Sequence, residues 1–248
     1  MVRSLVEMDE LVRVADLFAG IWGYPRGQLP VTPEMLRALT HAGNYVAGAW
    51  VDGALVGASA GFLGRRDDVT VLHSHISGVV PAHQGSQVGY ELKQHQRAWA
   101  IEREISTIEW TFDPLIRRNA YFNLAKLRAV IVAYEPDFYG AMRDEMNAGE
   151  ETDRVVARWN VHSPSASPAD VSDAQVILSA DTDRRPIMSP SDGPLLRAWI
   201  PEDYLRDRAQ LKGWRQAVRS TLGAAISHGY VATDMTRDGW YTLAKSPS

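Results

Sequence analysis

The sequence predicts an α/β (α+β) fold, with a mixed and mostly antiparallel sheet flanked by helices. Three observations indicate it. Strand-like segments joined by polar turns fill residues 44–80, and helical patterns with apolar spacings of three and four stand on both sides. A Ser/Pro-rich stretch, residues 162–174, then reads as a linker. We therefore expect a core domain over 1–161 and, packed on it, a strand-helix-hairpin extension over 175–248.

The composition excludes several classes of protein. The chain has 248 residues, is 45% hydrophobic, carries a net charge of -4 and has no cysteine. This charge predicts no attraction to nucleic acid or to anionic membranes, and the missing cysteines remove disulfides and thiolate chemistry. The opening "MVRSLVEMDELVRV" lacks the apolar core of a signal peptide, and no apolar run reaches membrane-spanning length. We expect a cytoplasmic protein with no membrane partner.

The N-terminal part predicts a short strand and two helices. The strand covers residues 2–7, and the first helix starts at Asp9. Its apolar face recurs every three or four residues, at Leu11, Ala15, Phe18 and Trp22. After the loop "GYPRGQLPV", Thr32 is a typical N-cap with Pro33 at the first helical position, and this second helix ends at about Ala42.

The central part predicts an antiparallel sheet followed by alternating helices and strands. Asp52 and Gly53 form a strong hairpin signal between two strands. The expected strands lie at 44–51, 54–63, 70–80, 106–112, 129–135 and 154–161, with a helix to Arg103 before 106–112 and another from near Pro114 after it.

The extension predicts a strand at 195–200, a helix at 201–228 closed by Gly229, and a hairpin over 230–243.

The stretch "PAHQGSQVGY", residues 81–90, has two glycines between a strand and a helix. A P-loop requires lysine followed by Ser or Thr, which this stretch lacks, and the dinucleotide pattern G-x-G-x-x-G does not match. The remaining functional hypothesis is a turn whose backbone amides bind pyrophosphate at a helix N-terminus. The alternative is that the turn only begins a helix and binds nothing. Two glycines favour close backbone approach to phosphate.

The segment "SGVVPAHQGSQVGYEL" resembles motif A of the GNAT superfamily of acyl-CoA-dependent N-acyltransferases, with the pattern Q/R-x-x-G-x-G/A. Gln84 fills its first position and Gly89 its last, whereas Gln87 replaces the central glycine. The order of elements is similar to the GNAT core, and so is "RRNAYFNLAKLRA" after the fifth strand. The resemblance covers about residues 1–161. "SHISGV", "WTFDPL", "RNAYFN" and "DFYG" resemble a subgroup of large bacterial GNAT proteins with a C-terminal extension.

The resemblance implies a GNAT fold and an acyl-CoA donor, acetyl-CoA by default, with no metal. It places amides of the turn on the pyrophosphate, the strand end beside the pantetheine arm, and the amide of Val79 or Val80 on the oxyanion of the reaction. The implied cofactor-binding residues are Gly78, Val79, Val80, Gln84, Gly85, Ser86, Gln87, Val88, Gly89, Tyr90 and Asn119.

Acyl transfer also needs a base and an acid. Glu109, in the middle of a strand, and His75 are the candidate bases; the alternatives are a carboxylate at a sheet edge and a hydrogen-bonded structural histidine. The family commonly supplies the acid from a tyrosine, but Leu124 stands at that position here. Tyr121 and Tyr139 are the substitutes, and the alternative is that they are core or pocket walls.

The family resemblance places the acceptor near the first two helices, where Trp22, Tyr24 and Arg26 offer aromatic walls and an anion-binding guanidinium, and Arg154 is a second anion partner. We expect an N-acyltransferase acting on a small-molecule amine, such as an amino acid. The rivals are a peptide or protein acetyltransferase and a non-catalytic CoA-binding protein. The extension is expected to cap the acceptor pocket or to build a homodimer.

Overall fold

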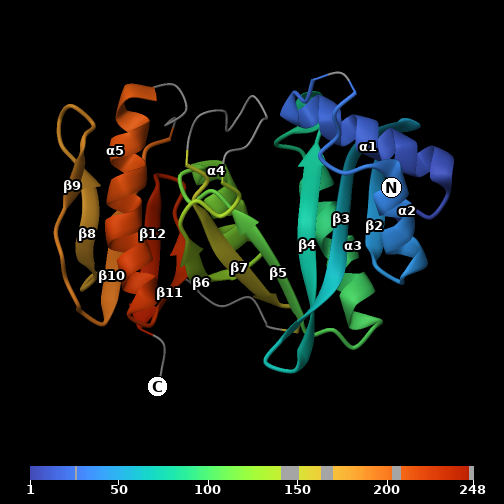
Figure 1. Ribbon diagram of the computed structural model, residues 1–248. Coiled ribbons are helices and arrows are strands. Elements are labelled where there is room, and N and C mark those ends of the chain that lie inside the picture. Colours follow the sequence, from blue (N-terminus) through green and yellow to red (C-terminus); the bar gives the residue numbers. More distant parts are fainter. Residues whose placement is uncertain (26, 141–150, 163–169, 203–207, 246–248) are drawn as a thin grey trace. The chain divides into compact units, whose positions relative to one another are not determined.

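The computed structural model describes residues 1–25, 27–140, 151–162, 170–202 and 208–245 (Figure 1). These residues form two compact units. The first comprises 1–110 and 160–162, and the second the remainder. Residues 163–169 of the expected linker lie outside the described part, and the domain boundary at 161 and the packing of the extension stay predictions.

The first unit contains a sheet with the strand order β1-β2-β3-β4-β5 (Figure 1). Strands β1 to β4 pair antiparallel, and β5 pairs parallel with β4. The strands are β1 (Val2–Ser4), β2 (Tyr45–Val51), β3 (Ala54–Arg66), β4 (Val69–Val79) and β5 (Thr107–Phe112). The predicted mixed, mostly antiparallel sheet flanked by helices is confirmed.

The hairpin predicted at Asp52 and Gly53 is present, and both residues have positive φ, 50° and 80°. Such a pair matches a two-residue hairpin turn. The polar run after β3 proves to be a second hairpin, with positive φ at Asp67 and Asp68. The predicted end of β3 at residue 63 was therefore too early, because exposed strand ends lack the apolar alternation that marks a strand.

Three helices cover this sheet, α1 (Met8–Trp22), α2 (Pro33–His41) and α3 (Val88–Ile101). The predicted N-cap is present, because Thr32 Oγ1 accepts the Met35 N–H at 3.2 Å. The apolar stripe of α1 enters one core cluster, with α2 and the sheet, and that of α3 enters another. The strand predicted over 2–7 ends at Ser4, and the chain passes through the buried Leu5 into α1.

The second unit has the strand order β7-β6-β11-β12-β10-β8-β9. Its strands are β6 (Val130–Glu135), β7 (Arg154–Asn160), β8 (Gln175–Ala180), β9 (Pro186–Met188), β10 (Leu195–Trp199), β11 (Tyr230–Met235) and β12 (Trp240–Lys245). The predicted hairpin over 230–243 is β11 and β12. Strands β8 and β9 were not predicted, because only Ile177 and Leu178 are buried in them and so no alternating pattern marks them.

The two helices predicted in the second unit are each interrupted by a π-helical segment. The helix expected from Pro114 begins only at α4 (Arg117–Ala120) and continues as a π-helical segment, Tyr121–Lys126. The helix expected over 201–228 consists of α5 (Arg208–Val218), a π-helical segment Arg219–Gly223 and α6 (Ala224–Ser227). Residues 203–207 of that prediction lie outside the described part. No helix among the described residues is long and apolar enough to span a membrane.

Candidate functional site

Strands β4 and β5 separate in the first unit. Their ladder consists of Leu72–Ile108 and His73–Glu109, after which β4 continues to Val79 without pairing with β5. We call the region beyond His73–Glu109 the β4–β5 fork. The register between β3 and β4 also shifts here, since Ala60 faces Ile76 but Gly61 faces Ser74, which leaves His75 as the extra residue of a β-bulge. A bulge bends its strand and redirects side chains.

The backbone at the end of β4 distinguishes Val79 from Val80. The Val80 N–H donates to the carbonyl of Val56 at 2.9 Å. Bonded and non-bonded pairs alternate in an antiparallel ladder, so the next pair, Gly57–Val79, directs its N–H groups away from each other. The Val79 N–H therefore points away from β3, toward the fork. Of the two amides that the resemblance implies for the oxyanion, the Val80 N–H is thus bonded within the sheet and the Val79 N–H is not bonded to β3.

The turn after β4 contains a left-handed glycine. Gly85 has φ of +79°, a conformation that glycine adopts without steric penalty. Gln84 closes the turn back on the strand, since its Nε2 donates to the Val79 carbonyl at 3.2 Å. Gln87 is the N-cap of α3 with φ of -74°, makes no side-chain capping bond, and is exposed. Replacing the family's central glycine by Gln87 therefore requires no positive φ.

The start of α3 presents backbone donors. Within the described residues, the N–H groups of Gly85, Gln87, Gly89 and Tyr90 donate no hydrogen bond. Unpaired amides and the positive end of the helix dipole favour an anion at such a place. A Cβ at Gly89 would lie 3.8 Å from Val79 Cγ2, an ordinary contact, so packing does not demand a glycine there.

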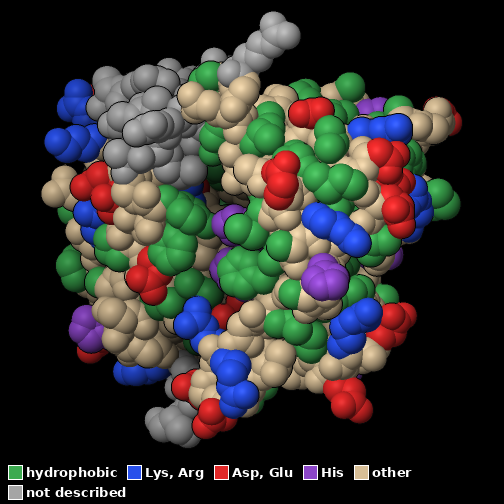
Figure 2. Space-filling view, turned by 45° about the vertical axis from the view of Figure 1, so that its right-hand side comes forward, with side chains coloured by type: hydrophobic (Ala, Val, Ile, Leu, Met, Phe, Trp, Pro, Cys, Tyr) green, Lys and Arg blue, Asp and Glu red, His purple; other side chains and the backbone are tan. Residues whose placement is uncertain are grey.

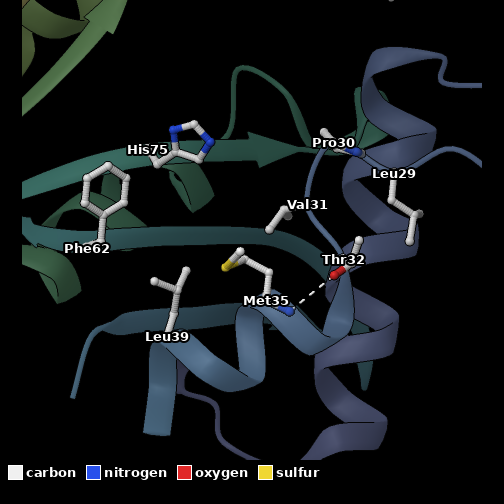
Figure 3. Close-up of a pocket in the computed structure, with 8 residues that line it drawn as sticks. All are labelled: Leu29, Pro30, Val31, Thr32, Met35, Leu39, Phe62 and His75. Atoms are coloured by element: carbon white, nitrogen blue, oxygen red, sulfur yellow. Dashed lines mark hydrogen bonds between the residues drawn. The ribbon is translucent and has the colours of Figure 1, made fainter. Parts of the chain in front are cut away.

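On the α1–α2 face of the sheet, His75 lines a cavity of about 400 Å³ (Figure 3). We call this the His75 cavity; its walls are Leu29, Pro30, Val31, Thr32, Met35, Leu39, Phe62 and His75. The Phe62 ring contacts both histidines of β4, with its centroid 4.9 Å from that of His73 and 5.8 Å from that of His75. Desolvation lowers the pKa of both histidines below the ordinary value, and their mutual repulsion adds to this for His73.

The second predicted base, Glu109, lies at the root of the fork. Its side chain is 2% exposed, and Oε2 accepts a hydrogen bond from Arg66 Nε at 3.2 Å. Arg66 comes from the end of β3, so the ion pair joins β3 to β5 across β4. This pair was not predicted, because the strand that carries Arg66 was expected to end at residue 63.

The opposite face of the fork carries a buried lysine that sequence reasoning missed. Lys93 of α3 is 5% exposed, and its Nζ donates to Ser74 Oγ at 3.0 Å and to Gln96 Oε1 at 3.1 Å. It also lies 3.9 Å from the ring centroid of Trp110. Burial lowers the pKa of Lys93 to about 7. Through Ser74 and Trp110, Lys93 ties β4 to β5 where their ladder ends.

Trp22 packs against the end of β4. A Cβ at Gly78 would lie 2.9 Å from both Trp22 Cη2 and Ile21 Cδ1, so this glycine makes room for the last turn of α1. Trp22 also contacts Phe18, with ring centroids 5.7 Å apart. Tyr24 is half-buried just beyond α1, and its N–H donates to the Ala19 carbonyl at 3.0 Å. Arg26 lies outside the described residues.

The other predicted residues belong to the second unit. Tyr139 and Arg154 come together, with the guanidinium carbon 5.3 Å from the ring centroid, and the Tyr139 hydroxyl is 3.2 Å from Thr111 Oγ1. The Tyr121 hydroxyl accepts from Arg237 Nε at 3.1 Å. Asn119 is half-buried in α4. Leu124 is fully buried, as expected of a core residue. The first unit thus gathers Trp22, His75 and residues 78–80 and 84–90, while Asn119, Tyr121, Tyr139 and Arg154 lie in the second.

The surface shows no strongly charged area on the face seen in Figure 2, where basic and acidic side chains are interspersed and histidines lie among hydrophobic ones. Among the described residues, no group of three His, Asp or Glu side chains is placed to hold a metal ion.

No protein-family model matches the chain, and no curated protein sequence does. Among solved structures, it is similar to a putative acetyltransferase, yncA, from Salmonella typhimurium, solved with acetyl-CoA: 15% identity, TM-score 0.52, 68% of this chain and 98% of that chain. It is also similar to an N-acetyltransferase from Staphylococcus aureus Mu50, with 11% identity and a TM-score of 0.52, over 65% of this chain and 98% of that chain. A third similar structure is that of an aminoglycoside 6'-acetyltransferase type Ii, with 15% identity and a TM-score of 0.51, over 66% of this chain and 99% of that chain.

Each of these solved chains is matched over nearly its whole length, whereas about two thirds of the present chain is matched. At such low identity the likeness is one of fold. The fold expected from the resemblance to the GNAT superfamily is thereby confirmed.

Proposed function

From a fold shared with solved acetyltransferases, we propose that the chain is an acyl-CoA-dependent N-acyltransferase, with acetyl-CoA as the default donor and a small-molecule amine as the acceptor. The donor would lie along the end of β4. The observation that carries this proposal is the set of unpaired N–H groups there: Val79 faces the fork, and Gly85, Gln87, Gly89 and Tyr90 follow at the start of α3.

These N–H donors are suited to the two negatively charged groups of the reaction, the pyrophosphate of CoA and the thioester oxygen of the transition state. The amides at the start of α3 would bind the pyrophosphate of CoA, for which a helix N-terminus is well suited. The Val79 N–H would donate to the thioester oxygen, which gains negative charge as the amine nitrogen attacks the carbonyl carbon. The C–S bond then breaks, and CoA leaves as a thiolate that takes up a proton.

We assign the base to His75 rather than to Glu109. Glu109 is already bound by Arg66, whereas His75 faces the cavity with part of its ring accessible. The lowered pKa keeps the His75 imidazole neutral at pH 7, the form that accepts a proton from the attacking amine. Tyr121 and Tyr139 stay the predicted acids, and Arg26 and Arg154 the predicted anion partners of the acceptor. A cytoplasmic location and a homodimer also stay predictions.

A donor-by-acceptor screen tests the proposal. The full chain is incubated with acetyl-, propionyl- and succinyl-CoA against a panel of amines, and free thiol is followed over time. We expect thiol release that depends on both substrates and is abolished when the amine is omitted. If no pair of substrates releases thiol and no CoA compound raises the melting temperature, the proposal is wrong.

The second candidate function is a CoA-binding protein without catalysis. It is motivated by the sequence, in which Leu124 stands where the family commonly places its tyrosine acid and Gln87 where it has a glycine. A protein of this kind would gain thermal stability from CoA, as any ligand of the folded state provides, yet would turn over no amine in the panel.

A further inference from the structure

The His75 cavity is built from three parts of the first unit. The loop before α2 supplies Leu29 to Thr32, helix α2 supplies Met35 and Leu39, and the sheet supplies Phe62 and His75. In Figure 3, Val31, Met35, Leu39, Phe62 and His75 point toward one common space. The cavity therefore lies directly beside the residue to which the base role was assigned.

The walls of this cavity are chemically uniform. Six of the eight lining residues are hydrocarbon or thioether side chains, and the described lining contains no Asp or Glu. The hydroxyl oxygen of Thr32 accepts the Met35 N–H, so it serves helix α2. His75 is the one titratable group of the described lining. An ammonium-rich ligand would find no counter-charge here, whereas an apolar group would leave water and contact carbon atoms.

The size of the cavity further limits the class of ligand that it can hold. About 400 Å³ lies in the lower part of the range for small-molecule pockets. A branched aliphatic or phenyl group fits such a space, and the amine attached to it would lie near the imidazole of His75.

We propose that the His75 cavity holds the apolar side chain of the acceptor, so that the substrate is a small amine with a branched aliphatic or aromatic group. This inference rests on the proposed function. It separates the present chain from acetyltransferases whose acceptors are polycations, such as the aminoglycoside enzyme of similar fold.

A kinetic comparison of matched amines tests this specificity. With the acyl-CoA that the screen selects, kcat/KM is measured for 2-phenylethylamine, isopentylamine, ethylamine and spermidine. Burial of the apolar group predicts kcat/KM at least tenfold higher for the first two than for ethylamine, and no preference for spermidine. Equal use of ethylamine, or preference for spermidine, would overturn the inference.

Two variants at one position locate the effect. Met35 is 54% exposed, so a substitution there is tolerated by the fold, and Met8, 41% exposed at the start of α1 and outside the cavity, is the matched control. Met35→Glu places a carboxylate at the wall and Met35→Trp fills the space. Each should lower the ratio of kcat/KM for 2-phenylethylamine to kcat/KM for ethylamine at least tenfold. Met8→Glu and Met8→Trp should change neither; equal effects at both positions would contradict the assignment.

A binding measurement separates this inference from the proposed function. The chain has seven methionines, and ¹³C labelling of their methyl groups allows each to be followed by NMR after assignment through Met35 and Met8 variants. Adding 2-phenylethylamine should shift the Met35 methyl resonance and leave that of Met8 in place. A Met35 shift without thiol release from any donor refutes the enzyme and leaves the cavity assignment intact. Thiol release with no Met35 shift up to saturating amine refutes the cavity assignment and leaves the enzyme intact.

Discussion

Replacing Lys93 by methionine should change how the stability of the protein depends on pH. Lys93 is buried between Ser74, Gln96 and the Trp110 ring, and burial lowers its pKa from 10.5 to about 7. Between these two values the unfolded chain holds a proton that the folded chain has lost. The free energy of unfolding must therefore rise with pH in this window, by about 1.4 kcal/mol per pH unit for one group.

The magnitude follows from the width of the window. Below pH 7 the folded protein keeps a buried ammonium group, which costs about 5 kcal/mol because burial lowers the pKa from 10.5 to about 7. Methionine has a similar volume and no charge, but it leaves two acceptors without their donor, which costs about 1–3 kcal/mol each. The free energy of unfolding of Lys93→Met should therefore increase relative to that of the wild type as pH falls, by about 2 kcal/mol between pH 9 and pH 7, because the slope is already halved at the folded-state pKa of about 7.

Urea unfolding at pH 7, 8 and 9, followed by circular dichroism, measures both proteins. The difference between them cancels the titration of groups that the substitution does not touch. Parallel curves, with a constant difference over the three pH values, would refute the reasoning, because they would mean that Lys93 keeps its proton in the folded state up to pH 9.

Three further substitutions probe the fork. Gln87→Gly should leave CoA affinity unchanged or tighter in calorimetry, since the side chain is exposed with φ of -74° and glycine is accepted at an N-cap; marked weakening would contradict the account of this turn. Gly78→Ala should reduce the free energy of unfolding by about 1–3 kcal/mol, because its Cβ would lie 2.9 Å from Trp22 and Ile21, and an unchanged urea midpoint would argue against that packing. His75→Gln should lower kcat by a factor of about 10²–10⁴. It should also remove the fall of kcat/KM at acidic pH, which in the wild type has its midpoint below 6.5 because the pKa of His75 is lowered. An unaltered pH profile would exclude His75 as the base.

Much of the fold could be predicted because its determinants are local. The hairpin at Asp52 and Gly53, the N-cap at Thr32 and the turn before α3 each depend on residues within a few positions. The motif around Gln84 and Gly89 added a family resemblance, from which the order of the elements could be predicted. These features need no knowledge of distant contacts.

The features of the site that escaped prediction depend on pairing between distant segments. The bulge at His75 arises from the register between β3 and β4, and no pattern within β4 alone marks it. Lys93 and Gln96 are of residue types that are mostly exposed in proteins, yet Ser59, Ser74 and Trp110 give them partners in the interior. A buried polar network of this kind is stabilised by contacts that a one-dimensional pattern does not contain.

The most direct test of the central claim, that backbone amides at the start of α3 bind the pyrophosphate of an acyl-CoA, is calorimetric titration of the full chain with CoA and with pantetheine. Pantetheine keeps the thiol arm and lacks the pyrophosphate. We predict saturable binding of CoA that is at least a hundredfold tighter than that of pantetheine and weakens with added salt, as expected of an anion held by charge and dipole. Equal affinity for the two compounds, or no binding of CoA, would contradict the account.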